Sequence, residues 1–135
     1  MIDAQSALIY VMVISSAADS DMTDRELETI GDTVKMLPVF DGFDMEKLPQ
    51  IAQECASLLQ DPDGLEKAFN AVRQSLPERL RETAYALSCD IVAADGLATQ
   101  EELRLLELLR HRLDVGRLEA AAIERGARAR HMPAV

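Results

Sequence analysis

The chain has 135 residues, of which 48% are hydrophobic and only 4% aromatic, and its net charge is −10 at pH 7. A chain of this length suits one domain with a sizeable core, and a core of Leu, Ile, Val, Ala and Met favours packed helices over sheet. The acidic balance argues against nucleic acid as a partner, because contacts to phosphates require a basic surface.

The negative charge is concentrated in the first half of the chain. Residues 1–66 carry 3 Lys or Arg and 14 Asp or Glu, which gives −11, whereas residues 67–135 carry 11 and 10, which gives +1. Two interpretations stand. The acidic residues form a solvated surface that keeps the protein soluble, or they form a face that attracts cations or a basic partner.

The two cysteines and the longest apolar run indicate in which cellular compartment the protein is expected. Cys55 and Cys89 lie in apolar helical contexts without the spacing of a metal site, and they are predicted to be buried small hydrophobes in a reducing compartment. The apolar run over 7–14 has 8 residues, far fewer than the roughly 20 that span a bilayer, and no basic residue precedes it. We therefore expect a cytoplasmic protein without a membrane helix or a secretory signal.

Hydrophobic periodicity predicts helices along the whole chain and no strand. The helices over 3–18 and 77–94 are apolar nearly all round, which is typical of central, buried helices. The other helices are predicted over 23–37, 44–59, 64–75, 99–113 and 115–128. Pro49 either kinks the helix over 44–59 or marks its true first turn.

These elements predict an all-α fold of about seven helices, with a single domain over 1–130 and a frayed tail over 131–135. In the last helix, Leu118, Ala122 and Ile123 are expected to face the core.

One motif occurs twice, at an offset of 76 residues. Ala17-Ala18-Asp19-x-x-x-Thr23-x-x-Glu26-Leu27 recurs as Ala93-Ala94-Asp95-x-x-x-Thr99-x-x-Glu102-Leu103. Each copy lies where one predicted helix ends and the next begins. We therefore predict two duplicated helix hairpins related by a pseudo-two-fold axis, with the helices over 3–18 and 77–94 as neighbours in the centre.

Half of this motif has a structural interpretation. Thr23 with Glu26, and Thr99 with Glu102, follow the capping-box pattern, in which the two side chains satisfy free N–H groups at the start of a helix. The loss of such a cap typically costs about 1 kcal/mol.

Asp19, Asp21 and Asp95 are less easily explained by capping. The spacing of Asp19 and Asp21 suits a calcium loop, but Asp24 and Ile30 stand where an EF-hand needs Gly and a bidentate Glu, so that motif is excluded. An anion at the end of a helix opposes the helix dipole. Asp19 and Asp95 either bond the first N–H groups of the next helix or hold a hard cation such as Ca²⁺ or Mg²⁺.

Asp90 falls on the apolar stripe of the second central helix, where a lone charge is costly to bury. We expect it either to bond a buried hydroxyl, amide or Arg, or to face the loop of Asp19 and Asp21 across the pseudo-axis. Catalysis has little support, because His111 and His131 are expected at the surface and no Ser/His/Asp set, phosphate loop or nucleophilic Cys is visible. We predict that the protein is not an enzyme.

The paired motif, with Ile91-Val92 before its second copy and Gly96 within it, resembles the TerB family of tellurite-resistance-associated helical domains over about residues 3–115. Ser20 stands where the family usually has Gly. The resemblance implies an all-α domain with an acidic surface cluster, associated with tellurite and other stress resistance and with assemblies at the inner face of the bacterial membrane. It also implies a candidate site for a divalent cation at Asp19, Glu26, Asp95 and Glu102, to which the local patterns add Asp21 and Asp90.

These features together predict a cytoplasmic, non-enzymatic, TerB-like domain whose acidic loops form a cation or protein-partner site in a stress response. Neither nucleic acid binding nor membrane insertion is expected. The rival is a helical scaffold or interaction module in which the acidic motifs only cap helices, and a carboxylate-dependent hydrolase ranks last. Titration with calcium or magnesium distinguishes the first two through the amide signals of Asp19 and Asp95.

Overall fold

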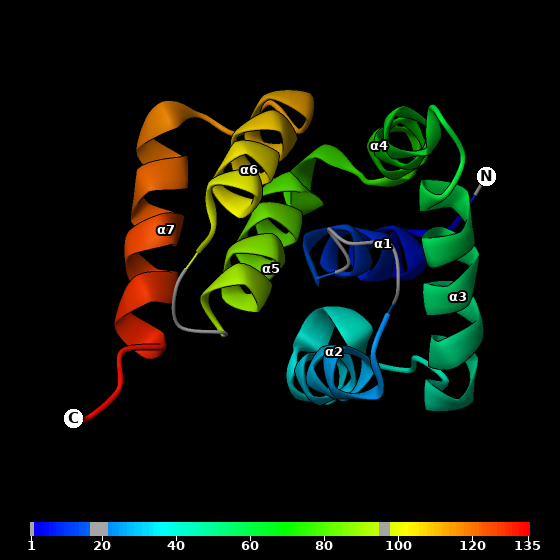
Figure 1. The fold of residues 1–135 in the computed structure, drawn as a ribbon, viewed down its shortest axis with the longest axis horizontal. Coiled ribbons are helices and arrows are strands. Elements are labelled where there is room, and N and C mark those ends of the chain that lie inside the picture. The colour runs from blue at the N-terminus through cyan, green and yellow to red at the C-terminus, as the bar shows by residue number, and fades with distance from the viewer. Residues whose placement is uncertain (1, 17–21, 95–97) are drawn as a thin grey trace.

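The computed structural model describes residues 2–16, 22–94 and 98–135, and every regular element in these ranges is a helix (Figure 1). The α-helices are α1 (Ala4–Ser16), α2 (Asp24–Met36), α3 (Leu48–Leu59), α4 (Gly64–Ser75), α5 (Arg81–Ala93), α6 (Gln100–Arg112) and α7 (Arg117–Arg130). Single turns of 3₁₀ helix form η1 (Pro38–Phe40), η2 (Met45–Lys47) and η3 (Glu78–Leu80). The predicted all-α fold of about seven helices is confirmed. None of the helices in the described ranges is both long and apolar enough to cross a membrane.

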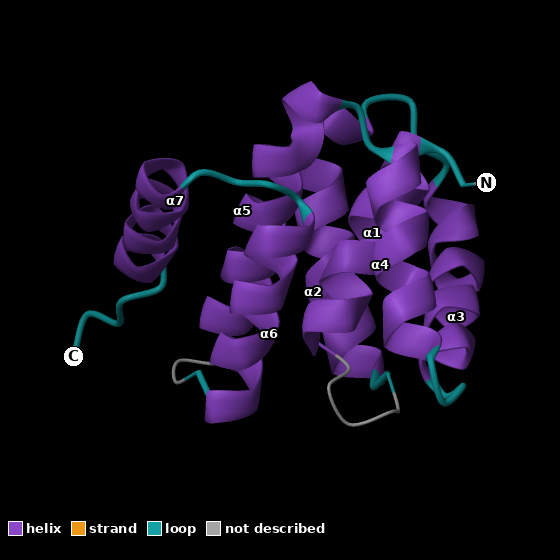
Figure 2. Ribbon diagram, turned by 90° about the horizontal axis from the view of Figure 1, so that it is seen from above, coloured by secondary structure: helices purple, strands orange, loops and turns teal. Residues whose placement is uncertain are grey.

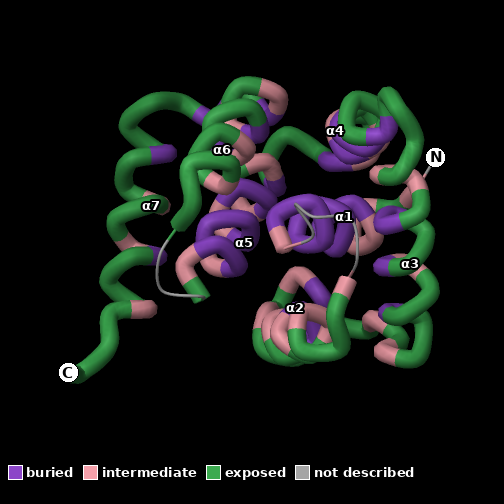
Figure 3. The backbone as a smooth tube through the Cα atoms, in the orientation of Figure 1, coloured by how far each residue is buried: buried purple, intermediate pink, exposed green. Residues whose placement is uncertain are grey.

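α1 lies at the centre of the molecule, where α3, α4 and α5 pack around it (Figure 1, Figure 3). Every residue of α1 from 7 to 15 is buried. A helix that is apolar on all sides is stable only when other elements cover each side, so this sequence requires a central position. α5 is the second central helix and packs against α1, α6 and α7. The predicted contact between the two central helices is therefore confirmed.

The packing of α1 on α5 includes one buried polar pair, in which the hydroxyls of Ser15 and Ser88 form a hydrogen bond. Both cysteines are free and buried, as predicted. Burial raises the pKa of Cys55 to about 12 and that of Cys89 to about 12, so both thiols are protonated at neutral pH.

Local sequence signals set the boundaries of the helices. Pro49 lies in the first turn of α3, where its missing N–H has no helical partner to lose, so it does not kink the helix. α2 ends before Pro38. The start of α4 requires Gly64, because a Cβ there would lie 2.0 Å from the carbonyl oxygen of Leu58.

α7 lies at one edge of the molecule and packs on α5 (Figure 2). It buries Ala120 and Ala127, with Ile123 partly buried beside them. The expectation that Leu118 and Ala122 face the core is wrong, since Leu118 is 78% exposed and Ala122 is also exposed. A helix rich in alanine has small residues on several sides, and the position of α5 decides which of them is buried.

The two halves of the chain repeat the same order of helices but differ in one connection. α2 (Asp24–Met36) and α6 (Gln100–Arg112) occupy the same positions at the offset of 76 residues. α3 packs on α1, and α7 packs on α5. Residues 37–47, with η1 and η2, join α2 to α3, whereas residues 113–116 alone join α6 to α7. The second half therefore has less chain to fill the space between its second and third helices.

Candidate functional site

The structure describes only some of the six residues predicted for a metal site. Asp19, Asp21 and Asp95 lie outside the described residues. The other three each have a defined partner. Within residues 2–16, 22–94 and 98–135, no group of three or more His, Cys, Asp or Glu side chains is placed to hold a metal ion. A cation site at the duplicated loops therefore stays a prediction.

Glu26 and Glu102 belong to the capping boxes at the starts of α2 and α6. The backbone N–H of Thr23 donates to Glu26 Oε1 at 3.0 Å, and the N–H of Glu26 donates to Thr23 Oγ1 at 3.1 Å. The corresponding distances between Thr99 and Glu102 are 2.9 and 3.1 Å. The capping interpretation is confirmed in both copies, and it fixes the register of α2 against α6 at 76 residues.

Asp90 forms an ion pair with Arg130 of α7. Its side chain is 26% exposed, so the carboxylate lies at the edge of the contact between α5 and α7 and not within the core that the apolar stripe suggested. An arginine was among the partners expected for this residue. The pair connects the end of α7 to α5 across a partly solvated edge.

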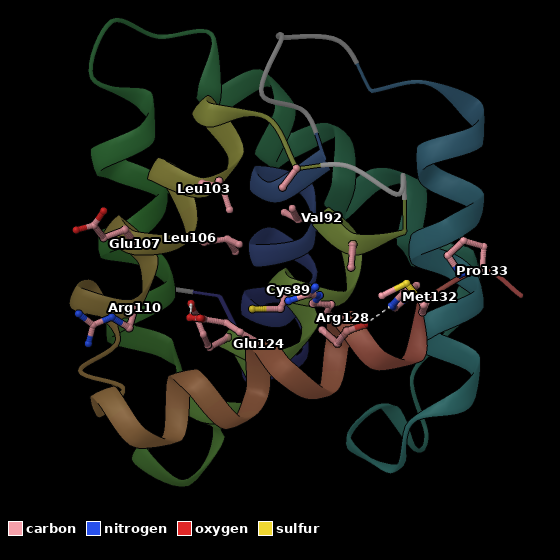
Figure 4. Close-up of a pocket in the computed structure, with 15 residues that line it drawn as sticks. Cys89, Val92, Leu103, Leu106, Glu107, Arg110, Glu124, Arg128, Met132 and Pro133 are labelled. Atoms are coloured by element: carbon pink, nitrogen blue, oxygen red, sulfur yellow. Dashed lines mark hydrogen bonds between the residues drawn. The ribbon is translucent and has the colours of Figure 1, made fainter. Parts of the chain in front are cut away.

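A groove of about 890 Å³ lies between α6 and α7, with α5 as its floor (Figure 4). Its lining residues come from α5 (Tyr85, Cys89, Val92, Ala93), α6 (Leu103, Leu106, Glu107, Arg110), α7 and the residues after it (Glu124, Ala127, Arg128, His131, Met132, Pro133), and from Ala98 before α6. We call this the α6–α7 groove. Leu103 and Leu106 point towards Val92 in its centre, whereas Glu107 and Arg110 lie at its rim. The groove has the size of a small-ligand or peptide site, with an apolar centre and a charged border.

One polar contact borders this apolar surface, between Tyr85 and Glu124. The Tyr85 hydroxyl donates to Glu124 Oε2 at 2.5 Å. Burial, and then this hydrogen bond to a carboxylate, raise the pKa of Tyr85 well above its ordinary value. The Tyr85 hydroxyl and the Cys89 thiol are therefore both protonated at neutral pH. Both are uncharged groups in the lining of the groove, next to apolar side chains.

Comparison with protein families identifies the fold. The family model described as Tellurite resistance protein TerB matches residues 5–125. The chain belongs to the TerB family. The match includes both copies of the duplicated motif, all of α5 and α6, and α7 as far as Arg125. No curated protein and no solved structure matches the chain.

The leucines of α6 recur at helical spacing, and this pattern does not by itself predict the groove in this TerB-family domain. Leu103 is 48% exposed and Leu108 is 41% exposed. Five leucines in the 13 residues of α6 cover more of the helix than one buried stripe needs. Glu107 and Arg110 follow Leu103 and Leu106 by four residues, so they share the leucines' face, and this mixture of charged and apolar residues is the signal for a partly open face.

Proposed function

We propose that this TerB-family domain is a non-enzymatic interaction module of a stress response, such as tellurite resistance, and that it binds a partner protein in the α6–α7 groove. The observation that carries the proposal is the groove itself. The half-exposed side chain of Leu103 and the outer atoms of Leu106 and Val92 border an open space of about 890 Å³ at the surface of the molecule. A concave apolar surface with a charged border is typical of binding sites.

The chemistry of the described side chains supports binding over catalysis. The thiols of Cys55 and Cys89 have pKa values of about 12, so neither supplies a thiolate at neutral pH. Glu26 and Glu102 cap helices, and Asp90 pairs with Arg130. The family resemblance supports a bacterial cytoplasmic setting, with a partner at the inner face of the membrane.

A divalent cation at the duplicated loops is a second candidate function. The capping bonds use Oε1 of Glu26 and Oε1 of Glu102, which leaves each carboxylate a second oxygen close to the loop of Asp19 or Asp95 in the sequence. Carboxylate oxygens suit Ca²⁺ or Mg²⁺. Titration with either ion is expected to shift the amide signals of residues 19–26 and 95–102 at submillimolar concentration. No shift up to several millimolar would contradict a cation site.

The groove proposal is tested in the organism of origin by deletion of the gene and by two matched substitutions. Leu103 and Leu108 are similarly exposed on α6, but only Leu103 lines the groove. We expect the deletion strain and the Leu103→Glu strain to lose growth on tellurite, whereas the Leu108→Glu strain grows like the parent. Equal growth of the deletion strain and the parent would contradict a role in tellurite resistance.

A further inference from the structure

The face of α6 that lines the groove has an equivalent in the first half of the chain that is covered. At the offset of 76 residues, which the two capping boxes fix, the groove residues of α6 correspond to residues of α2 in the pairs Leu27 and Leu103, Ile30 and Leu106, Gly31 and Glu107, and Val34 and Arg110. Ile30, Gly31 and Val34 are buried in α2, whereas in α6 Leu106 is buried but Leu103 and Glu107 are exposed. One helix face is therefore covered in one half of the protein and open in the other.

The cover in the first half is a short apolar segment of the chain itself. A Cβ placed on Gly31 would lie 3.5 Å from Leu48 Cδ2 and 3.9 Å from Met45 Cε, so both side chains contact α2 at this point. Phe40 of η1 is buried in the same connection, and η1 also packs on α2. The side chains placed on α2 at Gly31 are thus those of Met45 and Leu48, and the connection that carries them also buries Phe40.

The second half lacks such a segment. Residues 113–116 lead directly from α6 to α7, and α7 rests on α5. At the position of Gly31, α6 carries Glu107, whose side chain lies at the rim of the groove and not against a neighbouring helix. The groove beside Leu106 and Val92, where Leu103 is half exposed, is left open to an occupant from outside the chain.

We propose that the α6–α7 groove binds a short, apolar segment of a partner protein, with Phe, Met or Leu side chains placed on Leu103, Leu106 and Val92 as residues 37–48 place theirs on α2. This inference rests on the proposed function and names the class of partner. The groove favours an occupant of low net charge, because the two carboxylates in its lining, Glu107 and Glu124, are balanced by two guanidinium groups, Arg110 and Arg128. A strongly basic partner is attracted instead to the first half, which carries −11.

The test uses the full chain and a peptide with the sequence of residues 37–48 in which Asp41→Asn and Asp44→Asn bring the charge to zero, with blocked ends. A control peptide also carries Phe40→Ser, Met45→Ser and Leu48→Ser. Binding is followed by the amide signals of the protein in NMR titrations. We expect the first peptide to shift signals of Val92, Leu103 and Leu106 saturably and the control peptide to leave them unchanged. In the protein, Leu103→Glu is expected to weaken binding by about tenfold or more, whereas Leu108→Glu leaves it unchanged.

Two results would overturn the inference. One is an absence of shifts at the groove with the first peptide at millimolar concentration, and the other is a fatty acid or lipid bound in the groove and detected by native mass spectrometry. These failures are distinguishable from failure of the proposed function. If the peptide does not bind but Leu103→Glu still abolishes tolerance to tellurite, the partner class is wrong and the groove remains the functional site. If the peptide binds and deletion has no phenotype, the stress role is wrong.

Discussion

The two halves of this TerB-family domain have the same order of helices and the same caps, but their third helices, α3 and α7, pack differently. In the first half, α3 contributes Leu48, Ala52, Cys55 and Ala56 to the core, and the connection before it fills the space against α2. In the second half, α7 buries only Ala120 and Ala127 fully, and the α6–α7 groove remains open. The comparison teaches that the two halves share the hairpin and its caps, and that they differ in how the third helix covers it.

The way the third helix is held also differs between the halves. α3 meets α1 through apolar side chains, among them Cys55, whose thiol lies 3.8 Å from the carbonyl oxygen of Tyr10. α7 is held on α5 by small residues and by two polar contacts, Tyr85 with Glu124 and Asp90 with Arg130. The ion pair of Asp90 with Arg130 is partly exposed, and such pairs contribute little, about 0–1 kcal/mol.

The largest expected effect comes from equivalent core positions in α2 and α6. Ile30→Ala removes a fully buried side chain from α2, in the first half of the chain, and is expected to lower the free energy of unfolding by about 2–5 kcal/mol. Leu106→Ala, in the α6 wall of the groove, is expected to cost less, about 1–2 kcal/mol, because water can enter the space that it leaves. Urea unfolding of both variants measures the difference. Equal losses would show that the groove is as tightly packed as the first half.

The residues at positions 31 and 107 are equivalent, so we place at position 31 the glutamate that α6 carries at position 107. This substitution tests whether Met45 and Leu48 lie as close to α2 as the distances indicate. Gly31→Glu forces a charged side chain between Leu48 and Met45 and is expected to destabilise the protein by about 1–3 kcal/mol. Gly31→Ala is the control, since its Cβ makes ordinary contacts, and it is expected to stabilise by about 0.5–1 kcal/mol through helix propensity. Thermal unfolding separates the two, and a tolerated Gly31→Glu would contradict the closed packing.

The capping boxes are where the halves are expected to behave alike. Thr23→Ala and Thr99→Ala each remove the side-chain acceptor for one helix-start N–H and are expected to cost about 1 kcal/mol. The two losses should agree within a few tenths of a kcal/mol and add in the double variant, because the caps lie on different helices. A much larger loss at either threonine would indicate that its loop has a role besides capping.

The last comparison concerns the thiols, one in each half. Burial raises the pKa of Cys55 and of Cys89 to about 12, so the folded protein keeps both protonated where the unfolded chain ionises them. The free energy of unfolding is therefore expected to decrease as the pH rises from about 9 to about 12, and to decrease less in Cys55→Ala and Cys89→Ala. A thiol reagent at neutral pH should modify Cys89, which borders the groove, faster than Cys55. Faster reaction of Cys55 would contradict the difference between the halves.

Much of the fold follows from particular residues. α1 is apolar on all its sides and therefore requires a central position. The capping box of Thr23 and Glu26 begins α2, and Pro38 ends it. Pro49 lies in the first turn of α3. The site was less predictable. Leu103 has the spacing of a core residue, and nothing in its own helix states that α7 leaves it half exposed. Leu118 shows the same limit, because in an alanine-rich helix the apolar stripe does not identify the buried side.

The sequence by itself determined the all-α fold, the central helices, the duplicated hairpins and their caps, since these depend on periodicity and on hydrogen bonds within a few residues. The tertiary structure alone decided that Asp90 pairs with Arg130, which side of α7 faces α5, and that the face of α6 is open where that of α2 is covered. These features depend on the space between elements far apart in the chain, which is set by how residues 37–47 and 113–116 route the third helix of each half. A helix carries its own boundaries in its sequence, but whether its face is covered depends on where the rest of the chain lies.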